Sequence, residues 1–95
     1  FPALDLAYES LAKGGNMACI MNAANEAAVA AYLKDRIGFY DITDIVAETM
    51  AGSDFVASPD LDTIFRTNEA AYANAAELIE RTSLLKKLKK NVLQF

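Results

Sequence analysis

Apolar residues recur at intervals of three and four along most of the chain, which predicts amphipathic helices. Four of them, from Leu4 to Leu11, have this spacing after Pro2 and before Gly14, so a first helix is predicted over about residues 3–13.

A second helix is predicted to end near Lys34, and its start has two interpretations. Asn16 can be the N-cap of a helix that begins at Met17, or Asn22 can be the cap, which leaves residues 17–21 extended. We favour the longer helix.

The third helix has a marked start. Asp41 is predicted as its N-cap, with Asp44 three residues later in a variant of the capping box and Tyr40 and Ile45 at staple positions. Gly52 is predicted to end it. One face of this helix is apolar: Ile42, Ile45, Val46, Thr49 and Met50.

Residues 52–57 are predicted to form a loop. Ser58 and Pro59 then resemble an N-cap followed by a proline in the first helical position, which predicts a short helix through Phe65.

Thr67 is predicted to cap a last helix from about Asn68 to Arg81, with an extension to Val92 left open. These elements predict the all-α class: a small antiparallel helical bundle of four to five helices joined by short loops.

Length and charge narrow the picture. The 95 residues suffice for one small domain, and the first residue is Phe1, so we expect the chain to be processed or part of a longer protein. Residues 1–80 carry a net charge of −9, which argues against nucleic-acid binding, whereas residues 81–95 carry +5. We see no signal peptide, and the single cysteine, Cys19, fits a reducing, cytoplasmic location.

Candidate catalytic and metal chemistry is sparse. The chain has no histidine, which excludes a His-based triad within it. Asp54, Asp60 and Asp62 lack the spacing of a calcium loop, and Gly14-Gly15 lacks that of a phosphate loop and is predicted to be a turn. Cys19 is predicted to be a buried small apolar group. Three methionines are predicted core residues: Met17, Met21 and Met50.

The stretch Asn22, Ala23, Ala24, Asn25, Glu26 is unusual because asparagine is a poor residue for a helix interior. On a helix, the two asparagines and the glutamate share a stripe with Val29 and Leu33. Capping and packing explain this pattern if Asn22 is the cap and Asn25 the third helical residue. The alternative is a ligand or catalytic role, although two amides and one carboxylate make a poor active site.

The C-terminal residues 82–95 form a basic amphipathic tail. One face is apolar and carries Leu84 or Leu85, Leu88 and Val92, and most of the rest is lysine. Such a helix can lie on an anionic membrane, but the acidic body opposes this, so we expect no membrane binding. Otherwise the leucines dock on the bundle.

Three segments together resemble the C-terminal helical domain of the 1-deoxy-D-xylulose 5-phosphate reductoisomerase family. That family has a Phe-Pro-x-Leu-x-Leu-Ala opening, here residues 1–7, and a Leu-Asn-Ala-Ala-Asn-Glu core, here residues 21–26 with Met21 in place of Leu. It also has an Ile-x-Phe-x-Asp-Ile segment, here residues 37–42. The resemblance covers about residues 1–80.

The resemblance implies a parent enzyme with an NADPH-binding domain, a catalytic domain that binds a divalent metal (Mg or Mn) and this helical domain, residues 1–81. The parent converts 1-deoxy-D-xylulose 5-phosphate to 2-C-methyl-D-erythritol 4-phosphate in non-mevalonate isoprenoid synthesis. No catalytic, cofactor-binding or metal-binding position of the family has a match here, so the chain alone is expected to be inactive. The matching positions are a structural signature: Asn22, Ala23, Ala24, Asn25 and Glu26.

Two function classes follow. The first is a supporting domain of this enzyme, whose partners are the NADPH-binding and catalytic domains and whose amide stripe braces the helix against neighbouring backbone, in the bundle or in the catalytic domain. The second is an independent helical interaction module. In isolation, we expect the fragment to self-associate through the apolar surface that a missing partner leaves exposed.

Overall fold

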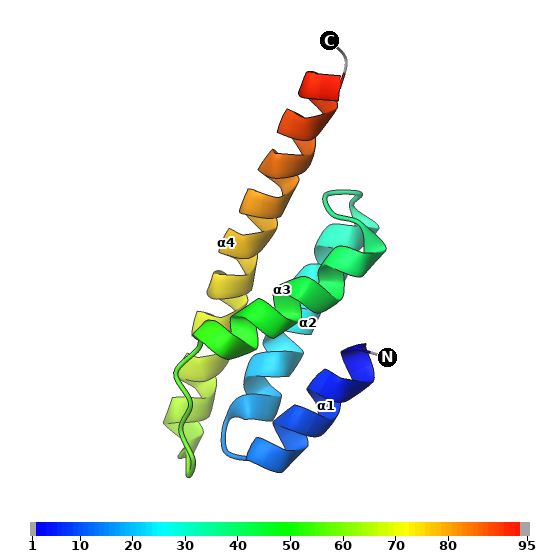
Figure 1. The fold of residues 1–95 in the computed structure, drawn as a ribbon. Helices are drawn as coiled ribbons and strands as arrows, with labels where there is room; N and C mark the ends of the chain where they lie inside the picture. Colours follow the sequence, from blue (N-terminus) through cyan, green and yellow to red (C-terminus); the bar gives the residue numbers. More distant parts are fainter. Residues whose placement is uncertain (1, 94–95) are drawn as a thin grey trace.

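The computed structural model describes residues 2–93 and contains four helices, α1 (Pro2–Lys13), α2 (Met17–Leu33), α3 (Phe39–Gly52) and α4 (Leu61–Leu93) (Figure 1). Within this range no strand is present, so the predicted all-α class is confirmed. The first helix ends where expected, and α2 starts at Met17, so the shorter alternative with Asn22 as its cap is wrong.

Helix α2 is the centre of the bundle: it packs against α4, α3 and α1. Its inward face is almost entirely alanine, because alanines recur at helical spacing between Ile20 and Ala31. The core takes the inward side chains of α2, α3 and α4 and of the α2–α3 turn: Met17, Ile20, Ala23, Ala24, Ala27, Ala28, Ala31, Ile37, Ile45, Val46, Met50, Ala71, Ala75 and Ile79.

The predicted apolar face of α3 and the predicted core methionines are confirmed. Ile45, Val46, Thr49 and Met50 are buried, and Ile42 packs against the core from its edge. Met17 is buried as well, and Met21 is half-buried against the core.

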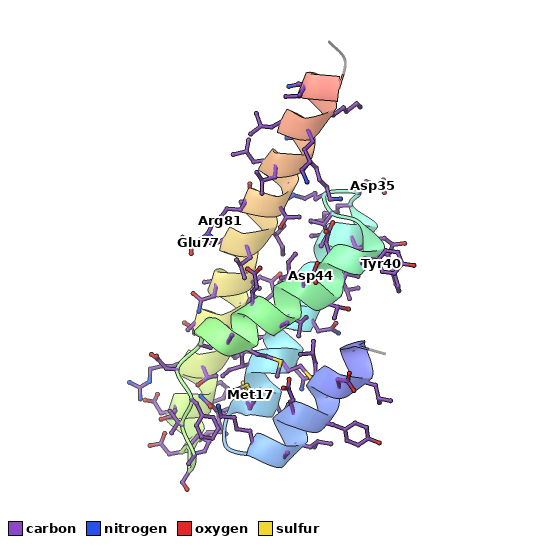
Figure 2. All side chains as sticks on the ribbon, in the orientation of Figure 1. Met17, Asp35, Tyr40, Asp44, Glu77 and Arg81 are labelled. Carbon is purple, nitrogen blue, oxygen red and sulfur yellow. The ribbon has the colours of Figure 1, made fainter. Side chains whose placement is uncertain are left out.

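The start of α3 differs from the prediction. Gly38, not Asp41, is the N-cap, and the Asp41 carboxylate accepts the Gly38 backbone N–H at 2.7 Å from the third helical position. The helix therefore begins three residues earlier, because a carboxylate stabilises a helix start from either position. The predicted staple is also wrong, since Tyr40 is 86% exposed and projects from the start of α3 (Figure 2).

Helix α4 is one continuous helix of 33 residues. The predicted cap at Ser58 and the predicted break before Thr67 are wrong. Instead Asp60 precedes the helix and accepts the Thr63 N–H at 2.7 Å. No glycine or proline interrupts residues 61–93, so nothing in this stretch breaks the helical hydrogen bonding.

The last third of α4 extends past the other three helices, and the molecule measures 53 × 27 × 20 Å (Figure 1). Helix α4 therefore continues through Val92, which was one of the two predicted ends of the last helix. The leucines of the tail, however, do not dock on the bundle. Leu84, Leu85 and Leu88 are 57%, 56% and 50% exposed.

Candidate functional site

The two alanines and the three polar residues of the signature lie on opposite sides of α2. Ala23 and Ala24 are 1% and 0% exposed, whereas Asn22, Asn25 and Glu26 are exposed. The alanines let α2 approach its neighbours closely, and the amides and the carboxylate lie on the outer surface. Asn22 lies in the second turn of α2, so its interpretation as a cap is wrong.

The two asparagines open onto a hollow between α1, α2 and α3, which we call the asparagine hollow. Its volume is about 200 Å³. Its lining is apolar apart from the two amides and one hydroxyl: Ala3, Leu6, Ala7, Met21, Asn22, Asn25, Ile42, Thr43 and Val46. Among the described residues the structure shows no side-chain hydrogen bond for Asn22, Asn25 or Glu26. The amides thus present both donors and acceptors to whatever approaches this face.

Large apolar side chains are also exposed on α1 and at the α2–α3 turn. The outer face of α1 presents Leu4, Tyr8 and Leu11, which are 53%, 64% and 74% exposed. At the α2–α3 turn, the Phe39 ring makes an edge-to-face contact with Tyr32, with ring centroids 5.7 Å apart. Exposed apolar groups of this extent, next to polar ones, are typical of a surface that contacts another protein.

Asn16 is a buried polar residue that the sequence did not single out beyond a cap. It occupies the cap position of α2 but makes no side-chain cap hydrogen bond, and it is 1% exposed. Its Nδ2 donates to the Asp54 carbonyl and to Thr67 Oγ1, both at 3.0 Å, and its Oδ1 accepts the Val56 N–H at 2.9 Å. One side chain thereby joins the α1–α2 turn, the α3–α4 loop and α4.

The Gly14-Gly15 turn brings Asn16 to this position. Both glycines have positive φ, +69° and +55°, which confirms the predicted turn and explains the residue type. A Cβ atom on Gly15 would lie 2.2 Å from the Val56 carbonyl oxygen, so only glycine fits. The backbone N–H of Asn16 donates to that same oxygen at 3.0 Å. The turn and the α3–α4 loop are therefore in backbone contact.

The side chains considered above as reactive or metal-binding groups make contacts that stabilise the fold. Cys19 was predicted to be buried and is half-buried; its Sγ lies 3.7 Å from the Ile64 carbonyl oxygen, and burial raises the pKa of its thiol. Hydrogen bonds from Thr63, first from its side chain and then from its backbone, lower the pKa of Asp60. Asp62 pairs with Arg66 one turn later at 3.1 Å.

Within residues 2–93, no group of three or more Cys, Asp or Glu side chains is arranged to hold a metal ion. None of the helices in this range has the length and apolar character needed to cross a membrane.

Two ion pairs join α4 to the α2–α3 region. Arg36 pairs with Glu80, and Lys86 pairs with Asp41 at 3.1 Å. Lys86 therefore lies on the side of α4 that faces α3, and the leucines of the tail lie on other sides of the helix.

The fold defines a small all-α helical domain, a bundle that carries exposed amide and apolar side chains on its surface. The family model for the DXP reductoisomerase C-terminal domain matches residues 1–74. The chain therefore belongs to the family of 1-deoxy-D-xylulose 5-phosphate reductoisomerase C-terminal domains, as the signature predicts.

Relatives agree with this assignment. The chain is 49% identical over 79 residues to the 1-deoxy-D-xylulose 5-phosphate reductoisomerase of Bacteroides thetaiotaomicron, covering 83% of this chain and 20% of the relative. It is 45% identical over 80 residues to the enzyme of Zymomonas mobilis, covering 84% and 21%. This chain thus spans about a fifth of the length of such relatives.

A solved structure matches as well. The reductoisomerase from Zymomonas mobilis in complex with NADPH superposes with a TM-score of 0.78 at 47% identity, covering 84% of this chain and 21% of that chain.

Proposed function

We propose that this chain is the C-terminal supporting domain of an NADPH-dependent oxidoreductase that converts 1-deoxy-D-xylulose 5-phosphate to 2-C-methyl-D-erythritol 4-phosphate, in non-mevalonate isoprenoid synthesis. The observation that carries the proposal is the family match over residues 1–74 together with the 47% identity to the Zymomonas mobilis structure. In this proposal residues 1–81 are the domain, and residues 82–95 are an additional basic tail. NADPH and a divalent metal, Mg or Mn, are bound by other domains of the parent.

The asparagine hollow is the contact point that we assign to the catalytic domain. Asn22 and Asn25 have exposed amides without partners among the described residues, beside an apolar lining. Each amide can donate and accept a hydrogen bond, so the pair suits a backbone segment with unpaired N–H and C=O groups. Glu26 extends the same stripe. The exposed face of α1 adds apolar contact area on the neighbouring side.

The proposal includes the surroundings of the protein. We place it in the cytoplasm because its single cysteine fits a reducing compartment, and we expect no nucleic-acid or membrane partner because residues 1–80 carry a net charge of −9. Separated from its other domains, the chain self-associates, since the apolar side chains of α1 and of the tail are exposed.

A domain exchange tests the supporting role. Residues 1–81 replace the corresponding C-terminal part of the Zymomonas mobilis enzyme, and turnover is followed by NADPH absorbance. An active hybrid supports the proposal. A hybrid that folds and binds NADPH but has lost turnover contradicts the supporting role and leaves the independent interaction module.

Asn25→Ala tests the bracing role within the same hybrid. Loss of a partly buried hydrogen bond at a domain contact costs about 1–2 kcal/mol, so the hybrid should unfold more easily or lose activity, while the 95-residue chain alone should be unaffected. Asn68→Ala is the matched control, because Asn68 is an exposed asparagine on α4. Equal behaviour of the two variants in the hybrid would reject the bracing role.

A further inference from the structure

The C-terminal segment of α4, residues 81–93, carries an apolar stripe that its own bundle leaves uncovered. Leu84, Leu88 and Val92 recur at intervals of four and are 57%, 50% and 70% exposed. Lys86 occupies the side of the helix that faces the bundle, where it pairs with Asp41. Because α4 is straight and continuous here, the stripe cannot turn onto its own bundle without breaking the helix (Figure 1).

The bundle has an open groove between α1 and α3, which we call the α1–α3 groove. It has a volume of about 560 Å³ and is distinct from the asparagine hollow, with which it shares Leu6. Met17, a buried residue in the first turn of α2, also lines it. Its walls are formed largely by small or flexible apolar side chains, with one acid and one base: Leu6, Glu9, Ala12, Lys13, Met17, Ala47, Met50 and Ala51. Alanines on two facing walls leave room for the side chains of a third helix.

Charge favours the pairing of these two surfaces. Helices α1 and α3 together carry five acids and one base, Lys13, whereas residues 81–95 carry five bases and no acid. Glu9 lines the groove on its α1 side, and α3 carries Asp44 and Glu48, of which Glu48 lies toward α4. The pair of Lys86 with Asp41 shows that the acidic surface of α3 already accepts a lysine of this segment within one chain.

We propose that the C-terminal segment of one chain docks in the α1–α3 groove of a second copy, with the leucine stripe inward and the lysines toward Glu9 and the acids of α3. This rests on the proposed self-association and assigns it a site. Two segments pairing with each other would bring two charges of +5 together, and the groove avoids this repulsion. An anionic lipid surface also attracts the lysines, but it repels residues 1–80, which carry a net negative charge. In a second copy, that same negative charge attracts the lysines.

Association of the 95-residue chain, whose core lies within it, is measured by sedimentation equilibrium at low and high salt. The wild-type chain should associate, and salt should weaken the association because rim charges are screened. Glu9→Lys should weaken it on the order of tenfold, and Leu88→Gln by a similar factor. Glu69→Lys, the same charge change on an exposed part of α4, should leave it within about twofold of wild type.

The position of the contact is tested by mixing isotope-labelled chains with chains that carry a spin label at residue 91, introduced as Asn91→Cys in a Cys19→Ser background. Broadening of the labelled amides in residues 9–13 and 47–51 is the expected result. A chain that is monomeric at every concentration would overturn both the self-association and its site. Association with broadening elsewhere, insensitive to Glu9→Lys, would overturn the site alone.

Vesicles of phosphatidylserine and phosphatidylcholine test whether the C-terminal segment binds an anionic lipid surface instead of a second copy. If the chain is monomeric and binds these vesicles, and if Leu88→Gln abolishes that binding, the segment binds a lipid surface rather than a second copy. This result would overturn the proposal. Absence of vesicle binding, together with association in solution, supports the groove.

Discussion

Replacement of Asn16 by alanine removes three hydrogen bonds from a side chain that is 1% exposed. The Val56 N–H, the Asp54 carbonyl and the Thr67 hydroxyl each lose a partner. A net hydrogen bond contributes about 1 kcal/mol, and a buried group left unpaired costs about 1–3 kcal/mol. Asp54 is exposed, so water can replace its lost bond, and the expected destabilisation is about 2–4 kcal/mol. For a domain of this size, that is a large part of its total stability.

Urea unfolding followed by far-ultraviolet circular dichroism measures this free energy of unfolding. Asn22→Ala is the matched control, since it makes the same chemical change on an exposed position of the same helix. Thr67→Val removes one of the three partners and should cost about 1 kcal/mol. If Asn16→Ala lowers the free energy of unfolding by less than about 0.5 kcal/mol, as a surface change does, the assignment of Asn16 as the joint between these segments is refuted.

Three further predictions follow from the geometry. Gly15→Ala places a Cβ atom against the Val56 carbonyl and should destabilise by more than about 2 kcal/mol in the same unfolding assay, whereas Gly14→Ala, in open space, should cost only the strain of its positive φ, about 1 kcal/mol. The folded-state pKa of Asp60 is lowered, so its stabilising effect is present above the unfolded pKa and is lost as pH falls through the folded one. The gap in unfolding free energy between wild type and Asp60→Asn should therefore close in acid, and a gap independent of pH would contradict this. The 95-residue chain should neither bind NADPH in calorimetry nor oxidise it with 1-deoxy-D-xylulose 5-phosphate and Mg or Mn; saturable binding would show that the cofactor site was assigned to the wrong domain.

Periodicity predicted the helices well where one face is clearly apolar. The start of α2 at Met17, the buried face of α3 and the turn at Gly14-Gly15 are all local patterns, fixed by side-chain spacing or by positive φ. Helix boundaries near polar residues were predicted less well. Asp41 and Thr67 have the residue types of caps, but the same side chains stabilise a helix from the third position or accept a hydrogen bond from elsewhere.

The hydrogen bonds through which Asn16 joins three segments could not be predicted from the spacing of residues in the sequence. Its partners Asp54 and Thr67 are 38 and 51 residues away in the sequence, so only the packing of α2 against α4 brings them together. The signature residues, in contrast, were identified in advance from the resemblance. The structure adds that they divide into buried alanines and exposed polar residues.

The alanine-rich interface of α2 has a consequence for how this domain depends on its surroundings. A buried alanine removes a single methyl group from water, so five buried alanines on α2 contribute far less apolar area than five leucines would. The tight fit leaves no space for larger side chains, and substitutions such as Ala24→Leu would force the helices apart. Because such an interior contributes little burial free energy, binding of a partner to the folded form alone would raise the stability of this domain by mass action. In the proposed parent enzyme, the stabilisation between this domain and its neighbours is mutual.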